Sequence, residues 1–357
     1  MQNIKDFTLE ELRGELVKMG EKPFRAEQIF SWIYRENVTS FEEMTNLSKD
    51  LRKKLEENYT LNNYKILSKL ESKDGTKKYL FDVLDGNAIE TVLMEYKFGK
   101  SICISSQIGC KMGCKFCAST GIPFIRSLTA GEIAEQILAV ERDEKIKVSN
   151  VVFMGIGEPL DNFENVIRAI SLLNEPKGLN IGARHISIST SGVVPKIYEL
   201  ADRKLQCTLS ISLHATTNEK RSSMMPVNNA YPIEELMKAC RYYIEKTNRR
   251  ISFEYALAKD SNDNLEDAKR LVKLLHGMLA HVNLIPINPI ENGAYSKSTN
   301  ENILKFRDYL NDNGITATVR RELGSDIEAA CGQLRRKFTR KAYKGENDEN
   351  TSDYSGI

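Results

Sequence analysis

The first sixty residues repeat apolar side chains at the spacing of a helix. Leu9, Leu12 and Leu16 form the first series, and further series occupy residues 26–33 and 41–55. Apolar residues three and four positions apart lie on one face of a helix, and that face packs on its neighbours. The pattern therefore predicts a small helical accessory domain over residues 1–62.

The apolar pattern changes to strict alternation between residues 63 and 98. Runs such as KKYLFDV and AIETVLM place every second side chain on the same face, as a half-buried strand does. The pairs Asp74-Gly75 and Asp85-Gly86 are typical of tight turns. We predict a β-hairpin linker over residues 63–98. Glu90 lies on its last strand, where a glutamate is by default exposed to solvent.

From Gly99 onward, short β-branched runs alternate with amphipathic helical segments. Strands are predicted at residues 101–106, 150–155, 184–190, 207–213, 252–257 and 281–286, and helices at 129–144, 163–174, 233–247 and 265–279. Six such units predict an α/β fold whose parallel sheet curls into a partial (β/α)6 TIM-like barrel over residues 99–336. Residues 315–321 form a further strand-like run. The polar segment 337–357, which ends in the acidic stretch KGENDENTSDYSGI, is expected to be disordered.

Composition and charge narrow the class of protein. No run of eighteen apolar residues and no apolar leader is present, so we expect a cytoplasmic protein without a membrane partner. Seven cysteines favour metal binding or catalysis in a reducing compartment over a disulfide framework. With a net charge of +2, nucleic-acid binding would need a local patch. Residues 317–344 carry eight Lys or Arg against three acidic residues, as such a patch or a solvated tail would.

Three cysteines, Cys110, Cys114 and Cys117, are spaced C-x3-C-x2-C in a loop after the first barrel strand. Structural zinc centres and ordinary iron–sulfur clusters take four protein ligands. A compact set of three without an evident fourth therefore favours a [4Fe-4S] cluster with one open iron. The alternative is a zinc site completed by a remote histidine, in an RNA-binding protein without catalysis.

Unusual polar segments follow other predicted strands at their carboxyl ends: GIGEPLDN at 155–162, STSG at 189–192, SLHATT at 212–217 and NP at 288–289. In a β/α barrel this rim carries the active site. An open iron there could be chelated by the amino and carboxylate groups of S-adenosylmethionine (SAM), a cofactor that brings its own radical chemistry. Gly157 would allow close backbone approach to the amino group, from which Glu158 could accept a hydrogen bond. The ribose and carboxylate could be bound by Ser189, Ser212 and Asn288.

These motifs resemble a known family. The loop CKMGCKFC and the GEP segment resemble the radical SAM superfamily. The longer segments SSQIGCKMGCKFCAS, MGIGEPLDN, STSGVVP, SLHA, INP and DIEAACGQL resemble the RlmN family of bacterial adenine-C2 RNA methyltransferases, from the N-terminal domain to about residue 336. The resemblance implies methylation of C2 of an adenine in the 23S rRNA peptidyl-transferase loop and of the adenine 3′ of the anticodon in tRNA. It also implies an electron donor such as flavodoxin or ferredoxin, and an N-terminal domain that contacts RNA.

The resemblance also assigns roles to particular residues. The cluster ligands would be Cys110, Cys114 and Cys117. The residues that bind SAM would be Gly157, Glu158, Ser189, Ser212, Leu213, His214 and Asn288. The catalytic residues would be Cys331, Cys103 and Glu90.

The implied mechanism uses two SAM molecules per turnover. One methylates Cys331, and the second yields a radical that takes a hydrogen from this methyl group. The carbon then adds to adenine C2, Glu90 accepts a proton, and Cys103 attacks the sulfur, leaving a transient Cys103–Cys331 disulfide. Such a route suits adenine C2, an electron-poor carbon without a lone pair to attack a sulfonium.

Simpler interpretations of single residues stand beside these roles. Cys103, on an apolar strand, could fill the core, as we expect of Cys207 and Cys240. His214 could be a buried histidine with satisfied hydrogen bonds. The nearest functional alternative is a Cfr-type enzyme, which methylates C8 of the same rRNA adenine and confers antibiotic resistance. The segments GEPLDN, SLHATT and LIPINP favour the C2 enzyme.

Overall fold

The computed structural model describes residues 1–121, 123–288 and 295–329. Its α-helices are α1 (Leu9–Lys18), α2 (Arg25–Tyr34), α3 (Lys49–Asn58), α4 (Ala130–Glu144), α5 (Phe163–Asn174), α6 (Val194–Asp202), α7 (Asn218–Met224), α8 (Ile233–Thr247), α9 (Leu265–Leu275) and α10 (Asn300–Asp312). The strands of the main sheet are β3 (Lys65–Glu71), β4 (Lys77–Asp82), β5 (Ala88–Tyr96), β6 (Gly99–Cys103), β9 (Asn150–Phe153), β10 (Ile186–Thr190), β11 (Thr208–Ser212), β12 (Ile251–Leu257), β13 (Ala280–Pro286) and β14 (Ala317–Val319). Two short pairs complete the set: β1 (Gln2–Asn3) with β2 (Tyr59–Thr60), and β7 (Gln107–Ile108) with β8 (Arg126–Ser127).

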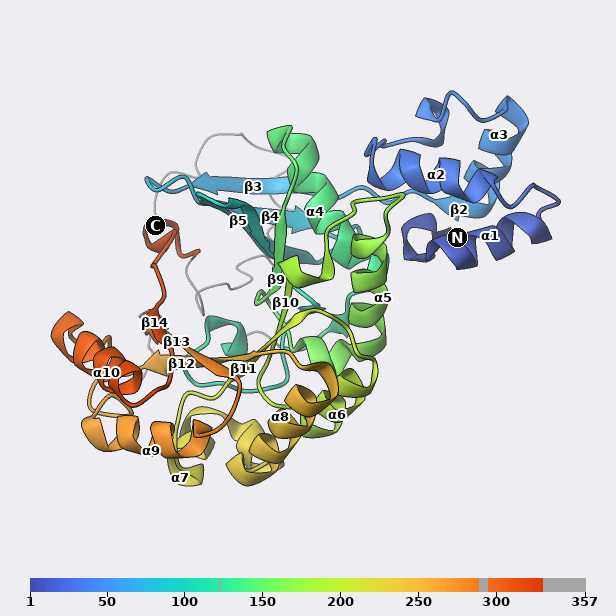
Figure 1. The fold of residues 1–357 in the computed structure, drawn as a ribbon. Helices are drawn as coiled ribbons and strands as arrows, with labels where there is room; N and C mark the ends of the chain where they lie inside the picture. Colours follow the sequence, from blue (N-terminus) through green and yellow to red (C-terminus); the bar gives the residue numbers. More distant parts are fainter. Residues whose placement is uncertain (122, 289–294, 330–357) are drawn as a thin grey trace.

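One ten-stranded sheet runs through the molecule in the order β14-β13-β12-β11-β10-β9-β6-β5-β4-β3. The neighbours from β6 to β14 pair in parallel, and helices cover the outer face of this part, as Figure 1 shows. The predicted α/β class and partial barrel are confirmed. The strand-like run near residue 317 is a seventh parallel strand, and α6, α7 and α10 are helices for which the sequence analysis gave no ranges.

The segment predicted as a hairpin linker continues the barrel sheet. Its three strands pair antiparallel, and β5 pairs with the first barrel strand, with Val92 opposite Cys103. Glu90 is 6% exposed, so the default expectation of a surface glutamate is wrong. The reason is that β5 has a neighbouring strand on each side and is covered on its faces, which the alternating pattern does not reveal.

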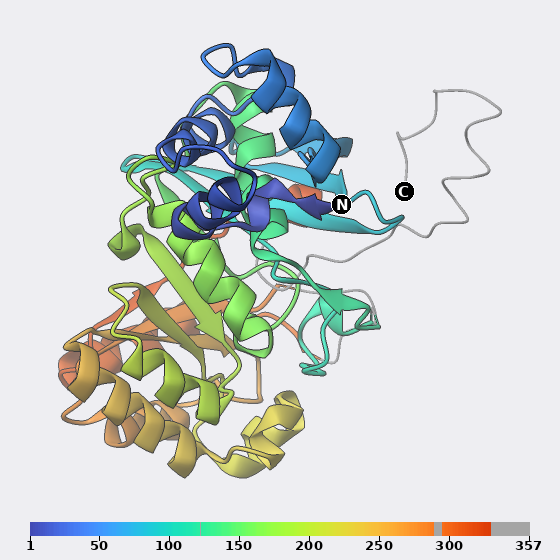
Figure 2. The same cartoon turned by 90° about the vertical axis from the view of Figure 1, so that its right-hand side faces the viewer.

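A buried ion pair joins the N-terminal helices to the barrel. The Lys5 Nζ donates to Glu135 Oε2 on α4 at 2.5 Å and to the Asn62 carbonyl at 2.7 Å. Gly131 makes this approach possible, because a Cβ there would lie 2.7 Å from the Lys5 carbonyl carbon. Breaking a buried pair of this kind typically costs about 3–5 kcal/mol. The helices α1 to α3 are thereby held beside α4 at one end of the molecule, away from α7, α9 and α10 (Figures 1 and 2).

The apolar core is continuous from the N-terminal helices through the inside of the helical layer. Cys207 and Cys240 belong to it, as expected from their apolar surroundings. Within the residues that the structure describes, no helix combines the length and the apolar character needed to cross a membrane.

Candidate active site

The carboxyl ends of the barrel strands and the cysteine loop surround one cavity, which we call the first cavity. Sequence-predicted residues that line it are Cys110, Cys114, Cys117, Gly157, Glu158, Ser189, Ser212, His214 and Asn288. They come from five separate segments of the chain, so the expected convergence on one rim is observed. Leu213 does not line this cavity, because its side chain is fully buried in the core.

The cysteine loop is closed at its base by the antiparallel pair β7 and β8. Gly109 has φ +76°, and a Cβ there would lie 2.1 Å from the Pro123 carbonyl oxygen, so only glycine fits where the two ends cross. At the far side, the Lys115 N–H donates to the Met224 carbonyl at 2.9 Å. Burial raises the pKa of the Cys110 thiol to about 11 and that of Cys114 still further. Metal binding would therefore have to displace protons from these thiols.

The donor set fits a three-cysteine cluster. The three thiols lie in one loop and face one cavity. Zinc would need its ligands gathered around a single point, and in the described part of the chain no three His, Cys, Asp or Glu side chains are so placed. In a cubane each cysteine binds a different iron, so the sulfurs need not converge. Three thiols of one loop that line one cavity are thus compatible with such a cluster.

Glu158 joins the ends of two strands. Its carboxylate accepts from the Ser191 N–H at 2.7 Å and from the Leu160 N–H at 3.0 Å. Burial raises the pKa of this carboxyl, and these hydrogen bonds oppose that rise. A carboxylate oxygen has further acceptor capacity, so Glu158 can still receive a hydrogen bond from an amino group in the cavity.

Gly157 is explained by a contact that sequence reasoning missed. It has φ +107°, and a Cβ there would lie 2.6 Å from Gln107 Cβ. The Gln107 side chain in turn accepts from the Glu158 N–H at 2.9 Å and donates to Asp161 at 2.8 Å. A glycine is thus required at position 157 by the Gln107 side chain alone, independently of any ligand in the cavity.

Glu254 is a second residue that sequence reasoning missed. It lines the first cavity, is 3% exposed, and accepts from Asn283 Nδ2 at 2.7 Å and Ser252 Oγ at 2.9 Å. A charged residue within the mostly apolar run ISFEYAL was the signal that could have revealed it. Glu254 lies in the middle of β12, opposite Ser212 of β11, and a buried carboxylate there suits recognition of a polar group in the cavity.

His214 is held as a neutral hydrogen-bond donor. Its Nδ1 accepts from the Ala256 N–H at 2.9 Å, which leaves the proton on Nε2, and its ring meets Phe116 edge-on at 4.7 Å. Burial, aided by the charge of Arg221, lowers the pKa of His214 to about 3. Its Nδ1 therefore already has a hydrogen-bond partner, while the Nε2–H group can donate to a ligand in the first cavity.

This pKa makes the stability of the apoprotein pH-dependent. His214 stays neutral in the fold but binds a proton in the unfolded chain below about pH 6.5, so stability falls as the pH falls from there towards 3. We expect a loss of about 1–2 kcal/mol in the free energy of unfolding between about pH 7 and pH 5. Urea unfolding at both pH values measures it.

The matched variant is His214→Asn, which keeps an acceptor and tolerates the left-handed backbone at this position, φ +55°. It should lose most of this pH dependence, whereas His276→Asn at an exposed position should retain it. The same slope in His214→Asn as in the wild type would contradict the expectation.

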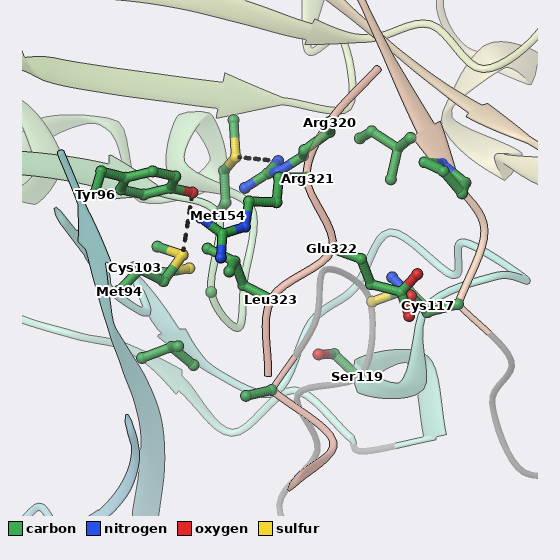
Figure 3. A pocket seen from close by; sticks show the side chains of 16 residues that line it. Met94, Tyr96, Cys103, Cys117, Ser119, Met154, Arg320, Arg321, Glu322 and Leu323 are labelled. Carbon is green, nitrogen blue, oxygen red and sulfur yellow. Dashed lines mark hydrogen bonds between the residues drawn. The ribbon is translucent and has the colours of Figure 1, made fainter. Parts of the chain in front are cut away.

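A second cavity, shown in Figure 3, shares part of its lining with the first. Met94, Tyr96 and Cys103 line one side of it, and Cys117 and Ser119 of the cysteine loop line the other. The two cavities share the lining residues Cys117, Ser119, Met154, Gly155, Ile285, Asn288 and Arg320. Cys103 thus lines a cavity that the cysteine loop also lines, besides packing in an apolar cluster.

Glu90 lies behind the second cavity and does not line it. Lys78 Nζ is 3.6 Å from Glu90 Oε1, and the Glu90 carbonyl accepts from Ser105 Oγ at 2.7 Å. Val92, two residues along β5, does line this cavity. The structure therefore places Glu90 near the second cavity, with a lysine beside its carboxylate.

Cys331 lies outside the described residues, as do residues 337–357, but the chain leading to Cys331 is held firmly. Asp74, in the turn between β3 and β4, accepts from the Gly324 N–H at 2.9 Å. Asp326 accepts from Ser72 Oγ at 2.5 Å and from the Lys73 N–H at 3.2 Å. Ala329 then lines the second cavity, two residues before Cys331.

Comparisons with known proteins place the chain in a family. Residues 2–61 match the ribosomal RNA large subunit methyltransferase N-terminal domain, and residues 104–275 match the radical SAM superfamily. Two curated relatives are each named "Probable dual-specificity RNA methyltransferase RlmN". The one from Clostridium novyi is 54% identical over 341 residues, covering 95% of this chain and 99% of the relative, and the one from Caldanaerobacter subterraneus is 55% identical over 342 residues, covering 96% and 100%.

A solved structure supports the same placement. The crystal structure of a radical SAM methyltransferase from Sphaerobacter thermophilus matches with a TM-score of 0.90 at 43% identity, covering 94% of this chain and 99% of that one. The resemblance inferred from the motifs is confirmed at both ends of the chain. This chain belongs to the RlmN family of the radical SAM superfamily.

Proposed function

We propose that this protein is a radical SAM RNA methyltransferase that methylates C2 of adenine in 23S rRNA and tRNA. The observation that carries the proposal is the shared wall of the two cavities, at which the cysteine loop adjoins the cavity of Cys103. The RNA substrate class is supported by the names of relatives that are matched over nearly their whole length. An electron donor such as flavodoxin or ferredoxin, and action in the cytoplasm, belong to the same proposal.

The first cavity would hold the cofactors. Cys110, Cys114 and Cys117 would bind a [4Fe-4S] cluster, which together with SAM supplies a radical when bound. The SAM molecule would be held by Gly157, Glu158, Ser189, Ser212, Leu213, His214 and Asn288. Of these, His214 would donate from Nε2 and Glu158 would accept. Leu213 belongs to this set by resemblance alone, since it lines neither cavity.

The second cavity would receive the adenine. Tyr96 and the thioethers of Met94 and Met154 offer an aromatic and polarisable lining, and Arg320 and Arg321 bring positive charge to it. Adenine C2 is inaccessible in a stacked helix, so the base would have to leave the stack to enter. The accessory helices α1 to α3 would contact the RNA outside this cavity.

Cys331 would carry the methyl group into the second cavity, and Cys103 would release the product from it. This part of the proposal uses two SAM molecules per turnover, one of them to methylate Cys331. Ala329 and Cys103 both line the second cavity, which supports a meeting of the two thiols there. Glu90 would accept the proton lost from C2, and Lys78 beside it would stabilise its charged form.

The position of the methyl group is tested directly by RNA analysis. RNA from a deletion strain, with and without this gene, is digested and its methyladenosine isomers are separated by mass spectrometry. We expect 2-methyladenosine in 23S rRNA and in tRNA only when the gene is present. Mainly 8-methyladenosine would refute the C2 assignment in favour of the Cfr-type alternative, which the matched relatives do not favour.

A further inference from the structure

Arg221 of α7 is a fully buried cation behind the wall of the first cavity. Its exposed fraction is 0%, and it does not line the cavity itself. The guanidinium donates to the carbonyls of Ser191 at 2.6 Å, Ser212 at 3.1 Å and Leu213 at 3.2 Å, and to Asn228 Oδ1 at 3.1 Å. It therefore joins the ends of β10 and β11 to the segment that follows α7.

All four of these acceptors are neutral. Carbonyl and amide oxygens satisfy the geometry of a guanidinium but do not cancel its charge, and burying a charge without a counter-charge is costly. Burial lowers the pKa of Arg221 to about 10, and negative charge on Cys114 or on Cys240 opposes this shift. Of these two thiols, Cys240 belongs to the apolar core, whereas Cys114 lies in the cysteine loop and lines the first cavity.

The helix that carries Arg221 also contacts the cysteine loop. The Met224 carbonyl at the end of α7 accepts from the Lys115 N–H at 2.9 Å, and Met225 lines the first cavity with Cys114. A Cβ on Gly113 would lie 3.4 Å from Pro226. The segment from Arg221 to Pro226 therefore forms the support on which the loop between Gly113 and Lys115 rests.

We propose that Arg221 is a positioning residue that acts as the buried counter-charge of the cluster and raises its reduction potential. This inference rests on the proposed binding of a [4Fe-4S] cluster by Cys110, Cys114 and Cys117. A doubly positive core with three thiolates carries one net negative charge, and uptake of one electron makes it two. A fixed positive charge nearby favours the more negative, reduced form, since net charge and surroundings set such potentials.

The test compares full-length variants after anaerobic reconstitution. Arg221→Gln removes the charge, Arg221→Lys keeps it but loses most of the forked hydrogen bonds, and Lys220→Met is the matched control. Lys220 is on the same helix, but its charge is paired with Asp267 at 2.6 Å. Each protein is titrated with dithionite, which supplies the electron, while absorbance and electron paramagnetic resonance report the reduced fraction. Iron content and the thermal melt of each apoprotein are measured alongside.

At the potential that half-reduces the wild-type cluster, the ratio of reduced to oxidised cluster should fall about tenfold in Arg221→Gln, equivalent to about 59 mV for one electron. It should stay within roughly threefold of the wild type in Arg221→Lys and Lys220→Met, because both retain the buried charge. An unchanged ratio in Arg221→Gln, or an equal fall in Arg221→Lys, would overturn the proposal in favour of a purely structural tie.

Two further outcomes are decisive. If Arg221→Gln gives no cooperative apoprotein melt, Arg221→Met, which keeps an unbranched side chain without the charge, is measured against the same tenfold expectation. A wild-type protein that binds no iron would refute the cluster assignment and this inference with it. If the wild type binds iron and Arg221→Gln has the same ratio of reduced to oxidised cluster, only the role of Arg221 is refuted.

Discussion

Replacement of Cys114 by alanine is expected to abolish both cluster binding and methyl transfer while the protein stays folded. Cys114 stands in the middle of the cysteine spacing, and its thiol faces the first cavity beside the positions expected to bind SAM. Two remaining thiolates cannot replace the third, because each would bind a different iron. We expect iron content at least about tenfold below that of the wild type after reconstitution, and no detectable methylation of RNA.

The matched control is Cys240→Ala on α8, which removes the same single sulfur atom as Cys114→Ala. Cys240 is fully buried in the apolar core and lines neither cavity. This variant should lose about 1 kcal/mol in the free energy of unfolding and keep its iron and activity. A full complement of iron in Cys114→Ala, or loss of iron in Cys240→Ala, would contradict the assignment of the ligands.

The barrel could be predicted because parallel strands buried on both faces form continuous apolar runs that stand out from amphipathic helices. Because parallel strands of one sheet all end at the same edge, the motifs that follow them must lie on one rim of the barrel. Cys110, Glu158 and His214, far apart in the sequence, were therefore expected to meet, and they line one cavity. The kind of cofactor could be predicted from the C-x3-C-x2-C spacing, since three clustered thiols without a fourth are typical of a [4Fe-4S] cluster with an open iron.

The features that escaped prediction depend on contacts between distant segments. Gly157 was expected to allow close backbone approach of a cofactor, and the room that it also gives to Gln107, fifty residues earlier in the chain, was not foreseen. Arg221 lies in a polar stretch for which the sequence predicted no role, and only its contacts with the ends of β10 and β11 show why it is buried. Asp74 read as a turn residue, although it also accepts from Gly324. Local periodicity carries no information about such partners.

Replacement of Cys331 by alanine is expected to abolish methyl transfer without affecting the cluster. The turn between β3 and β4 holds the chain through Asp326, and Ala329, two residues before Cys331 in the sequence, lines the cavity of Cys103. If the methyl group passes through this thiol, its loss should lower the rate at least about 1000-fold, as removal of a covalent nucleophile does. Iron content and the visible spectrum should match the wild type.

The control for Cys331→Ala is Cys207→Ala, a buried cysteine that lines neither cavity and should stay active. Cys103→Ala gives the complementary result. Without this thiol the sulfur of Cys331 cannot be released from the base, so RNA should remain covalently attached to the protein in a denaturing gel. Normal methylation by Cys331→Ala would refute the methyl-carrying cysteine and leave the family assignment intact. An attached RNA in Cys103→Ala, absent from the double variant with Cys331→Ala, would instead place both thiols on one reaction path.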